Sequence, residues 1–200
     1  MENIYDARVS KEKLEEMYST KMIAFATPGG GATTEGCKVL LDYYYAVRNG
    51  DDYINDVDNI DWANIGTFTT KKEYESEKYI EFINSLILSG GWCVQMDHWL
   101  GEDENDKFFV QKTHTFYDEC IFLANKSNEG LIWICSYNDA VKYYKERENA
   151  KIEILEKSEN YITLRVNVNL PKDIFNFPIT LQIGEKYIDA LPNEVIKIRI

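Results

Sequence analysis

The sequence has few histidines and prolines, and it contains no long apolar run. It has 2 histidines and 4 prolines among 200 residues. No run of about 18 apolar residues occurs, which argues against a transmembrane helix. Residues 1–13 are charged throughout and lack the apolar segment of a secretory signal. The 4 cysteines lie far apart without a short paired spacing, so a zinc knuckle or a thioredoxin-like pair is not supported.

Basic residues are scarce relative to acidic ones. The chain has 22 Lys and Arg against 34 Asp and Glu, which gives a formal net charge of -12. This charge repels phosphates and anionic membrane surfaces, so neither nucleic acid nor membrane is an expected partner. A neutral or cationic ligand, such as a sugar or an amino sugar, is not repelled. The hydrophobic content of 44% is sufficient for a sizeable core and argues against a disordered chain.

Short apolar runs alternate with helix-like segments along the first three quarters of the chain. Strands are predicted at 22–27, 44–48, 92–97 and 131–135, the last with Trp133 in the core. Helices are predicted from Thr33 or Thr34 to 43, from Thr69 or Thr70 to 89, at 113–124 and at 136–147. In the third helix, Phe116, Cys120 and Leu123 are expected to form one face. In the fourth, Ser136 and Asp139 are expected to form a capping pair. This alternation indicates an α/β fold with a parallel sheet or barrel.

The pattern changes after residue 150. Apolar residues then alternate with polar ones, as in strands with one buried face, and prolines and a glycine separate several short runs. We therefore expect an α/β domain at 1–149 and a small antiparallel β-strand extension at 150–200.

His98 is the first candidate for function. It follows the predicted strand 92–97, and the carboxyl ends of parallel strands are where α/β folds gather ligands and chemistry. It can be a general acid or a sugar-binding group, or a hydrogen-bonded histidine that closes a strand. Asp97 can bind substrate, orient the imidazole or bond to the loop backbone, although strict alternation places it on the opposite face from His98. Trp99 would offer an aromatic platform to a sugar. His114, near a helix start, is expected to be an exposed first-turn residue.

Three segments carry a family resemblance. The run Phe-Ala-Thr-Pro-Gly-Gly-Gly at 25–31, the strand ending in histidine at 90–101, and the strand and Tyr- and Lys-rich helix at 131–147 resemble motifs of the NodB-like polysaccharide deacetylases, a carbohydrate esterase family. The ordered series covers roughly residues 20–183, and some members have a similar β extension. The resemblance implies a NodB-type β/α barrel.

The resemblance also implies a reaction, the metal-assisted hydrolysis of acetyl groups on N- or O-acetylated sugars. In the family, a zinc-type divalent ion is held by two histidines and an aspartate, and a separate histidine protonates the leaving group. By position, His98 matches this general acid. The residues that would contact an acetylated oligosaccharide are Pro28, Gly29, Gly30, Asp97 and Trp99.

The sequence departs from the family at its metal site. No Thr-Phe-Asp-Asp-like pair precedes Met22, and no histidine precedes His98, so the ligand motif is not found. We therefore expect a partial or divergent barrel that lacks the first strands. Three interpretations remain. The first is a deacetylase-like hydrolase of carbohydrate metabolism that is inactive as this chain stands, which would make it a pseudoenzyme. The second is a non-catalytic carbohydrate-binding or scaffolding module, and the third is an incomplete or rearranged gene product. Exposed strand edges would allow a homo-oligomer. The family is often exported or at the cell surface, but nothing in the sequence directs export.

Overall fold

The chain divides into two compact units. The computed structural model describes residues 2–101 and 110–199, and the units are Met1–Cys135 and Ser136–Ile200. The division precedes helix α5 (Tyr137–Asn149), whereas the sequence pattern places a boundary after this helix, at 149. Within the described ranges, no helix combines the length and the hydropathy needed to cross a bilayer.

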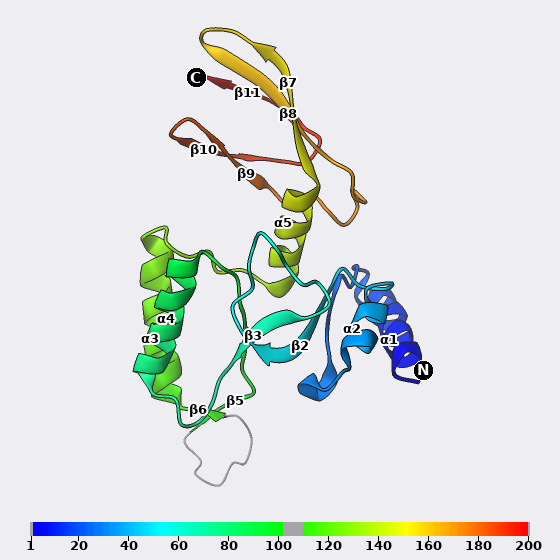
Figure 1. The fold of residues 1–200 in the computed structure, drawn as a ribbon, viewed down its shortest axis with the longest axis vertical. Helices are drawn as coiled ribbons and strands as arrows, with labels where there is room; N and C mark the ends of the chain where they lie inside the picture. Colours follow the sequence, from blue (N-terminus) through cyan, green and yellow to red (C-terminus); the bar gives the residue numbers. More distant parts are fainter. Residues whose placement is uncertain (1, 102–109, 200) are drawn as a thin grey trace. The chain divides into compact units, whose positions relative to one another are not determined.

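A curled, parallel four-stranded sheet forms the centre of the first unit (Figure 1). Its strands are β1 (Ala24–Ala26), β2 (Ala46–Asp52), β3 (Ile65–Thr69) and β4 (Val94–Met96). They are hydrogen-bonded in the order β1-β2-β3-β4, and each pair is parallel. Consecutive parallel strands without a reversal of order are the arrangement of half a β/α barrel. The predicted α/β class with a parallel sheet is therefore confirmed.

One of the four strands was predicted in the wrong place. The segment 131–135 is not a strand, and Leu131, Trp133 and Ile134 are 52%, 49% and 54% exposed. The prediction of Trp133 as a core residue is thus wrong. An apolar run becomes a strand only where a neighbouring strand offers hydrogen bonds. This run instead connects the end of one helix to the start of the next.

The missed strand is β3, which is buried at all five positions. Its sequence, Ile-Gly-Thr-Phe-Thr, contains two threonines and a glycine and so lacks an apolar run. The helix predicted from Thr69 or Thr70 begins at Ser76, because Thr69 belongs to this strand.

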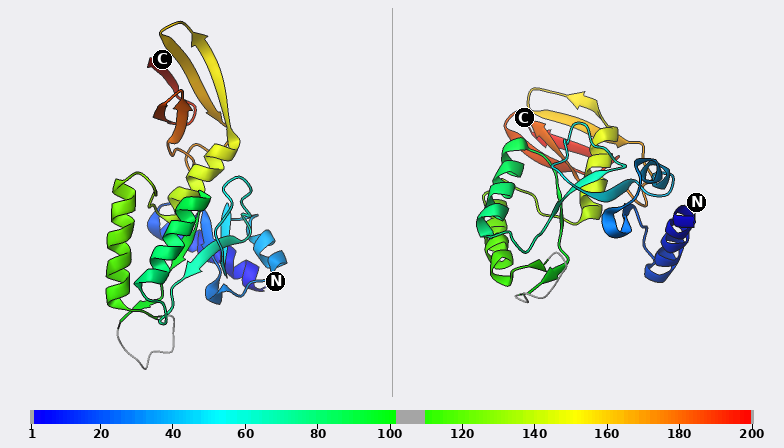
Figure 2. Two further views of the ribbon diagram at one scale, coloured as in Figure 1. Left: turned by 60° about the vertical axis from the view of Figure 1, so that its left-hand side comes forward. Right: turned by 60° about the horizontal axis from the view of Figure 1, so that its bottom comes forward.

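Helices and short strands complete the first unit. They are α1 (Glu2–Tyr18), the 3₁₀ turn η1 (Pro28–Gly30), α2 (Thr34–Leu40), α3 (Ser76–Ser89), β5 (Trp99–Leu100), β6 (Val110–Gln111) and α4 (Thr113–Asn128). The Thr33 hydroxyl caps α2 by accepting a hydrogen bond from Gly36 N at 3.1 Å. Gly90, at a φ of +63°, ends α3 in the left-handed conformation. Helices α3 and α4 lie side by side (Figure 2).

The second unit consists of α5 and two antiparallel sheets. The strands are β7 (Ala150–Lys157), β8 (Tyr161–Val168), β9 (Ile179–Ile183), β10 (Lys186–Ala190) and β11 (Val195–Arg199), paired as β11-β8-β7 and β10-β9. The predicted antiparallel extension is confirmed, and so is the cap of α5, where Ser136 Oγ accepts from Asp139 N at 3.1 Å. The buried core residues are Leu164, Val166, Val168, Ile179, Leu181, Ala190 and Ile198.

Strand β7 forms one edge of the three-stranded sheet. Its Ile152 and Ile154 are paired in register with the buried Val166 and Leu164 of β8. Both isoleucines are nevertheless exposed, at 60% and 58%. The alternation of apolar and polar residues therefore shows that the two isoleucines share a face of β7, but it does not show that this face is buried.

Candidate functional site

The carboxyl ends of the parallel strands bring polar residues together on the face that points away from the helices. Val47 of β2 packs in a cluster with Leu40 of α2, and Phe68 of β3 stacks on Phe82 of α3 with ring centroids 3.9 Å apart. Because side chains alternate along a strand, the neighbours Arg48 and Thr67 lie on the opposite face.

Asp52 connects β2 to β3 on this face. Its Oδ1 accepts hydrogen bonds from Thr67 Oγ1 at 3.1 Å, Thr69 N at 2.9 Å and Thr69 Oγ1 at 2.7 Å. The two threonines are buried, while Asp52 is exposed. The network fixes the end of the sheet and leaves a carboxylate facing solvent.

Arg48 extends across the sheet from β2 toward β4. Its Nη1 donates to the thioether sulfur of Met96. Among residues 2–101 and 110–199, no carboxylate lies within ion-pair distance of this guanidinium, so a neutral partner leaves its charge available. Arg48 was not predicted as a site residue, although its position at the end of a predicted strand was a usable signal.

His98 is exposed and lies after the end of β4, with Asp97 between them. It is two residues from Met96, the residue that Arg48 contacts. Asp97 lies beside Gln95, which alternates with Met96 in β4. Gln95 Nε2 donates to Asp97 Oδ1 at 3.1 Å and to its Oδ2 at 3.3 Å.

Behind Asp97 lies a buried carboxylate, Glu119 of α4, which is 2% exposed. Its Oε2 accepts from Gln111 Nε2 at 2.7 Å and from Gln95 Nε2 at 3.3 Å. Burial raises the pKa of Glu119, the two amide donors oppose this rise, and the charge of Asp97 adds to it.

The buried residues of α4 differ from those expected. They are Thr115 and Glu119. The predicted face of Phe116, Cys120 and Leu123 is wrong in part, since Cys120 is exposed. Hydrogen bonds from Gln111, just before α4, and from Gln95 of β4 explain why a carboxylate occupies this buried position.

The second histidine is separate from this arrangement. His114 is in the first turn of α4 with a side chain 58% exposed, and its Nε2 lies 3.6 Å from Glu75 Oε2. The prediction of an exposed first-turn residue is confirmed.

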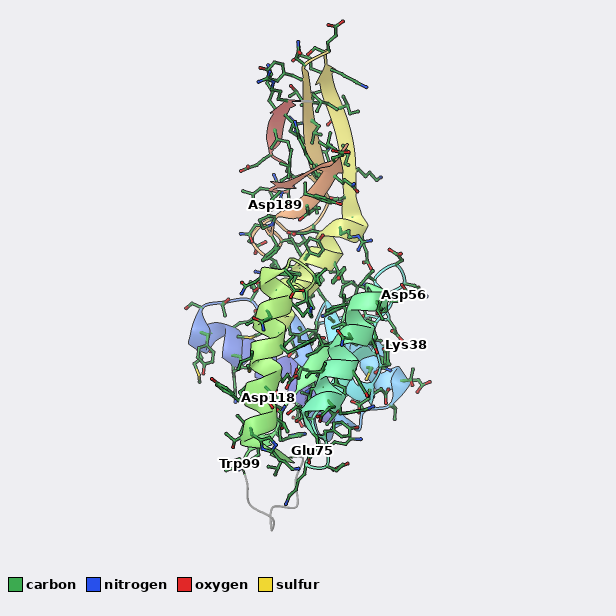
Figure 3. The ribbon with its side chains drawn as sticks, turned by 90° about the vertical axis from the view of Figure 1, so that its left-hand side faces the viewer. Lys38, Asp56, Glu75, Trp99, Asp118 and Asp189 are labelled. Carbon is green, nitrogen blue, oxygen red and sulfur yellow. The ribbon has the colours of Figure 1, made fainter. Side chains whose placement is uncertain are left out.

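Trp99 and Trp92 flank His98 in the sequence but differ in burial. Trp99 is 61% exposed in β5 and lies at the same end of the first unit as Glu75 (Figure 3). Trp92 is 9% exposed and forms an isolated bridge with Asn55, whose side-chain Nδ2 also donates to Trp92 O at 2.8 Å. Of the two rings, that of Trp99 can therefore receive a sugar.

The bend that contains Pro28, Gly29 and Gly30 follows β1, on the opposite edge of the sheet from β4. Three inter-strand spacings separate the edge strands, which is roughly 14 Å along the sheet. A Cβ on Gly30, which has a φ of +62°, would lie 2.6 Å from Asn49 O, so this position requires glycine. The bend and His98 thus follow strands at opposite edges of the sheet. Both lie at its carboxyl end, with β2 and β3 between them.

The described residues do not supply a ligand set for the metal that the resemblance implies. In the part of the chain that the structure describes, no group of three or more His, Cys, Asp and Glu side chains could hold a metal ion.

Comparison with known proteins gives one weak similarity. No protein family matches the sequence, and no solved structure matches it. The chain is 20% identical over 193 residues to a gellan lyase from Bacillus sp. The aligned part is 87% of this chain but 8% of the gellan lyase, so the chain spans a small fraction of that protein's length.

Proposed function

We propose that this chain is a polysaccharide deacetylase-like protein of carbohydrate metabolism, with a half-barrel that corresponds to part of a NodB-type β/α barrel. An acetylated oligosaccharide would lie across the carboxyl ends of β1 to β4. The observation that carries this proposal is the hydrogen bond from Arg48 of β2 to Met96, the last residue of β4, two residues before the exposed His98. Parallel strands direct their ligand-binding groups toward this end.

In this proposal, each group has a distinct role. In N-deacetylation, water adds to the acetyl carbonyl, the C–N bond breaks, and acetate and a free amine form. His98 would act as the general acid that gives a proton to the leaving nitrogen, or to the leaving oxygen of an ester, and the attacking water would return one proton to it. The guanidinium of Arg48 would donate hydrogen bonds to acetyl or sugar oxygens, and Trp99 would stack on a sugar ring. Pro28, Gly29 and Gly30 would form the far wall of the groove.

A second candidate is a non-catalytic carbohydrate-binding or scaffolding module. It is favoured by the lack of a metal-ligand group within the described ranges, since the family's reaction depends on an activated water. The similarity to a gellan lyase supports a carbohydrate context for both candidates, because the name of that protein denotes action on a polysaccharide.

Titration with acetylated xylo- and chito-oligosaccharides tests the proposal. We expect binding to shift the His98 imidazole signals in the NMR spectrum, and His98→Ala to weaken affinity about tenfold, or about 1.4 kcal/mol. His114→Ala is the matched control, and it should leave affinity unchanged while identifying the remaining imidazole signal. Acetate release, measured with and without added zinc, separates the candidates: release that His98→Ala abolishes supports the hydrolase, and binding without release supports the module. Absence of binding to either oligosaccharide series would refute both.

A further inference from the structure

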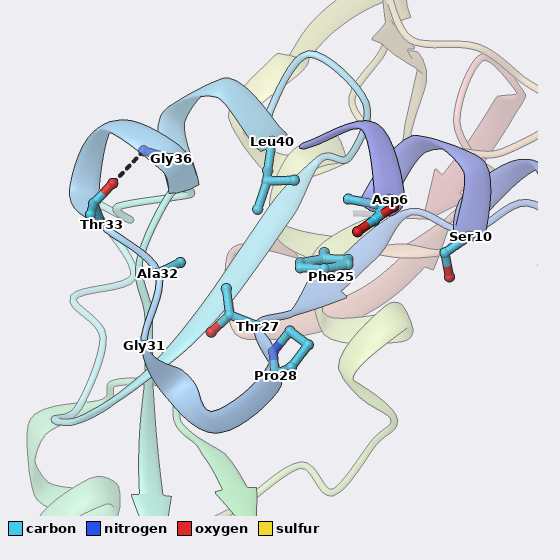
Figure 4. Close-up of a pocket in the computed structure, with 11 residues that line it drawn as sticks. Asp6, Ser10, Phe25, Thr27, Pro28, Gly31, Ala32, Thr33, Gly36 and Leu40 are labelled. Carbon is cyan, nitrogen blue, oxygen red and sulfur yellow. Dashed lines mark hydrogen bonds between the residues drawn. The ribbon is translucent and has the colours of Figure 1, made fainter. Parts of the chain in front are cut away.

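A pocket of about 620 Å³ lies in the first unit, beside the bend after β1 (Figure 4). Its walls come from α1, β1, the bend and the start of α2. This volume is within the range of roughly 300–1,000 Å³ that is typical of small-molecule sites. It lies on the helix-covered side of the sheet, since Phe25, which lines it, packs in the cluster with Leu40 of α2. It is therefore on the opposite face of the sheet from Arg48, although Pro28 of the bend lines the pocket and also belongs to the proposed groove.

Specific bonds hold α1 in place as the outer wall. Lys11 Nζ donates to Met22 O at 2.6 Å and to Tyr43 O at 2.8 Å. The hydroxyl of Tyr44 donates to Ala7 O at 3.0 Å. These bonds join one turn of α1 to Met22, before β1, and to Tyr43 and Tyr44, before β2. The position of α1 is therefore fixed by tertiary contacts as well as by its helix propensity.

One side of the pocket is apolar. Its apolar lining residues are Ala7, Phe25, Pro28, Ala32 and Leu40. The Phe25 ring is fixed by Tyr44, with ring centroids 5.0 Å apart. A fixed aromatic ring beside a proline is a suitable surface for one face of a sugar ring.

The polar side has one charge and three hydroxyls. Among the described residues that line the pocket, Asp6 is the charged one, and Ser10, Thr27 and Thr33 carry hydroxyls (Figure 4). The Thr27 hydroxyl donates to Asn49 Oδ1 at 2.8 Å. Thr33 Oγ1 already accepts from Gly36 N, so its own hydrogen can be donated to a ligand.

The carboxylate of Asp6 is exposed and not neutralised by its neighbours. Arg8 pairs with Glu12 at 3.8 Å and Lys11 pairs with Glu15 at 3.3 Å, both on α1. Within the described part of the chain, Asp6 forms no side-chain hydrogen bond or ion pair. A carboxylate beside an aromatic ring attracts a cation by charge-assisted hydrogen bonding and by cation–π attraction. The net charge of -12 acts in the same direction.

We infer that this pocket binds an amino sugar with a free, protonated amine. The ammonium group lies on Asp6, one face of the sugar ring rests on Phe25, and ring hydroxyls bond to Ser10 and Thr33. The choice of a sugar as the carrier of the amine rests on the proposed function, because removal of an N-acetyl group produces such an amine. The selectivity for cations does not depend on it.

Titration of the intact chain with glucosamine, N-acetylglucosamine and cadaverine tests this inference. In ¹H–¹⁵N NMR spectra, glucosamine should shift the amide signals of Asp6, Ser10 and Thr33, whereas N-acetylglucosamine, which lacks the charge, should not. Asp6→Asn should weaken glucosamine binding about tenfold. Asp42→Asn, the same charge change at an exposed position after α2, is the control and should have no effect.

Three results would overturn the inference: equal affinity for glucosamine and N-acetylglucosamine, equal affinity of the two aspartate variants, or cadaverine binding as tightly as glucosamine. Failure here and failure of the proposed function are distinguishable. The proposed function is tested by the signals of His98 during titration with acetylated oligosaccharides. This inference is tested by the signals of Asp6 during titration with a free amine.

Discussion

The two units bury different kinds of residue. Of the nine polar or charged residues that are buried in the described ranges, eight are in the first unit, and Glu146 is the one in the second. The second unit is built around aliphatic side chains from β8 to β11. Hydrogen bonds are directional, whereas apolar burial is not. The first unit thus uses its interior to fix strand ends and loops at the candidate site, while the interior of the second provides cohesion.

The largest effect should come from the aliphatic core of the second unit. Leu164 is 2% exposed and Ile154, paired with it in register, is 58% exposed. Leu164→Ala should lower the free energy of unfolding by about 2–5 kcal/mol, because it leaves a cavity. Ile154→Ala is the matched control and should cost much less. Thermal unfolding followed by circular dichroism checks this, and equal costs would show that apolar burial does not hold this unit.

The next effect concerns the buried carboxylate of the second unit. Glu146 Oε1 accepts from Phe177 N at 3.0 Å, and Oε2 is buried without a hydrogen-bond partner among the described residues. Burial raises the pKa of Glu146 from its ordinary value of 4.5 to about 7, against the opposing effects of the Phe177 amide and Lys142.

The raised pKa has a defined sign for stability. Between pH 4.5 and about 7 the folded unit binds a proton that the unfolded chain has released. Stability should therefore fall as pH rises through this window, by an amount on the order of 3 kcal/mol. Glu146→Gln should remove this part of the pH dependence, and Glu159→Gln, in an exposed turn, should retain it. Urea unfolding at a series of pH values measures the difference, and identical pH profiles for the two variants would refute the assignment.

The smallest effect should come from one buried amide of the first unit. Asn55 is 1% exposed, donates to Gly66 O at 3.2 Å and Trp92 O at 2.8 Å, and accepts from Gly66 N at 2.7 Å. Asn55→Ala leaves these groups unsatisfied and should cost about 1–3 kcal/mol. Asn59→Ala, in the exposed part of the same loop, is the control. All 4 tryptophans precede residue 136, so tryptophan fluorescence reports on the first unit. If Asn55→Ala left the free energy of unfolding unchanged, buried polar groups would not organise this unit.

Local signals in the sequence predicted the helix ends and the apolar alternation. The caps at Thr33 and Ser136 and the stop at Gly90 depend on residues within four positions, so they can be recognised without the fold. Strand β3 could not be recognised in this way, because its threonines are satisfied by Asp52, which lies in a different strand. The segment 131–135 failed for the converse reason, since its sequence suits a strand and no neighbouring strand pairs with it in the described chain.

The candidate site was predictable in part for the same reason. His98 and Trp99 could be found because a strand end is a local feature, and both are exposed. Arg48 and Glu119 depend on Met96 and Gln95, which are distant in the sequence. The catalytic role of His98 and the roles of Trp99, Pro28, Gly29, Gly30 and Asp97 in substrate binding remain predictions.

The order β11-β8-β7 has a consequence for solvent exchange. Strand β8 has a partner on each side, so its peptide hydrogens are engaged in both directions. Strand β7 is paired on one side, and alternate peptide N–H groups along it point outward. After transfer to deuterated water, the amide hydrogens at alternate residues of β7 should exchange while those of β8 are still protected. This pattern would identify β7 as the edge strand and β8 as the central strand.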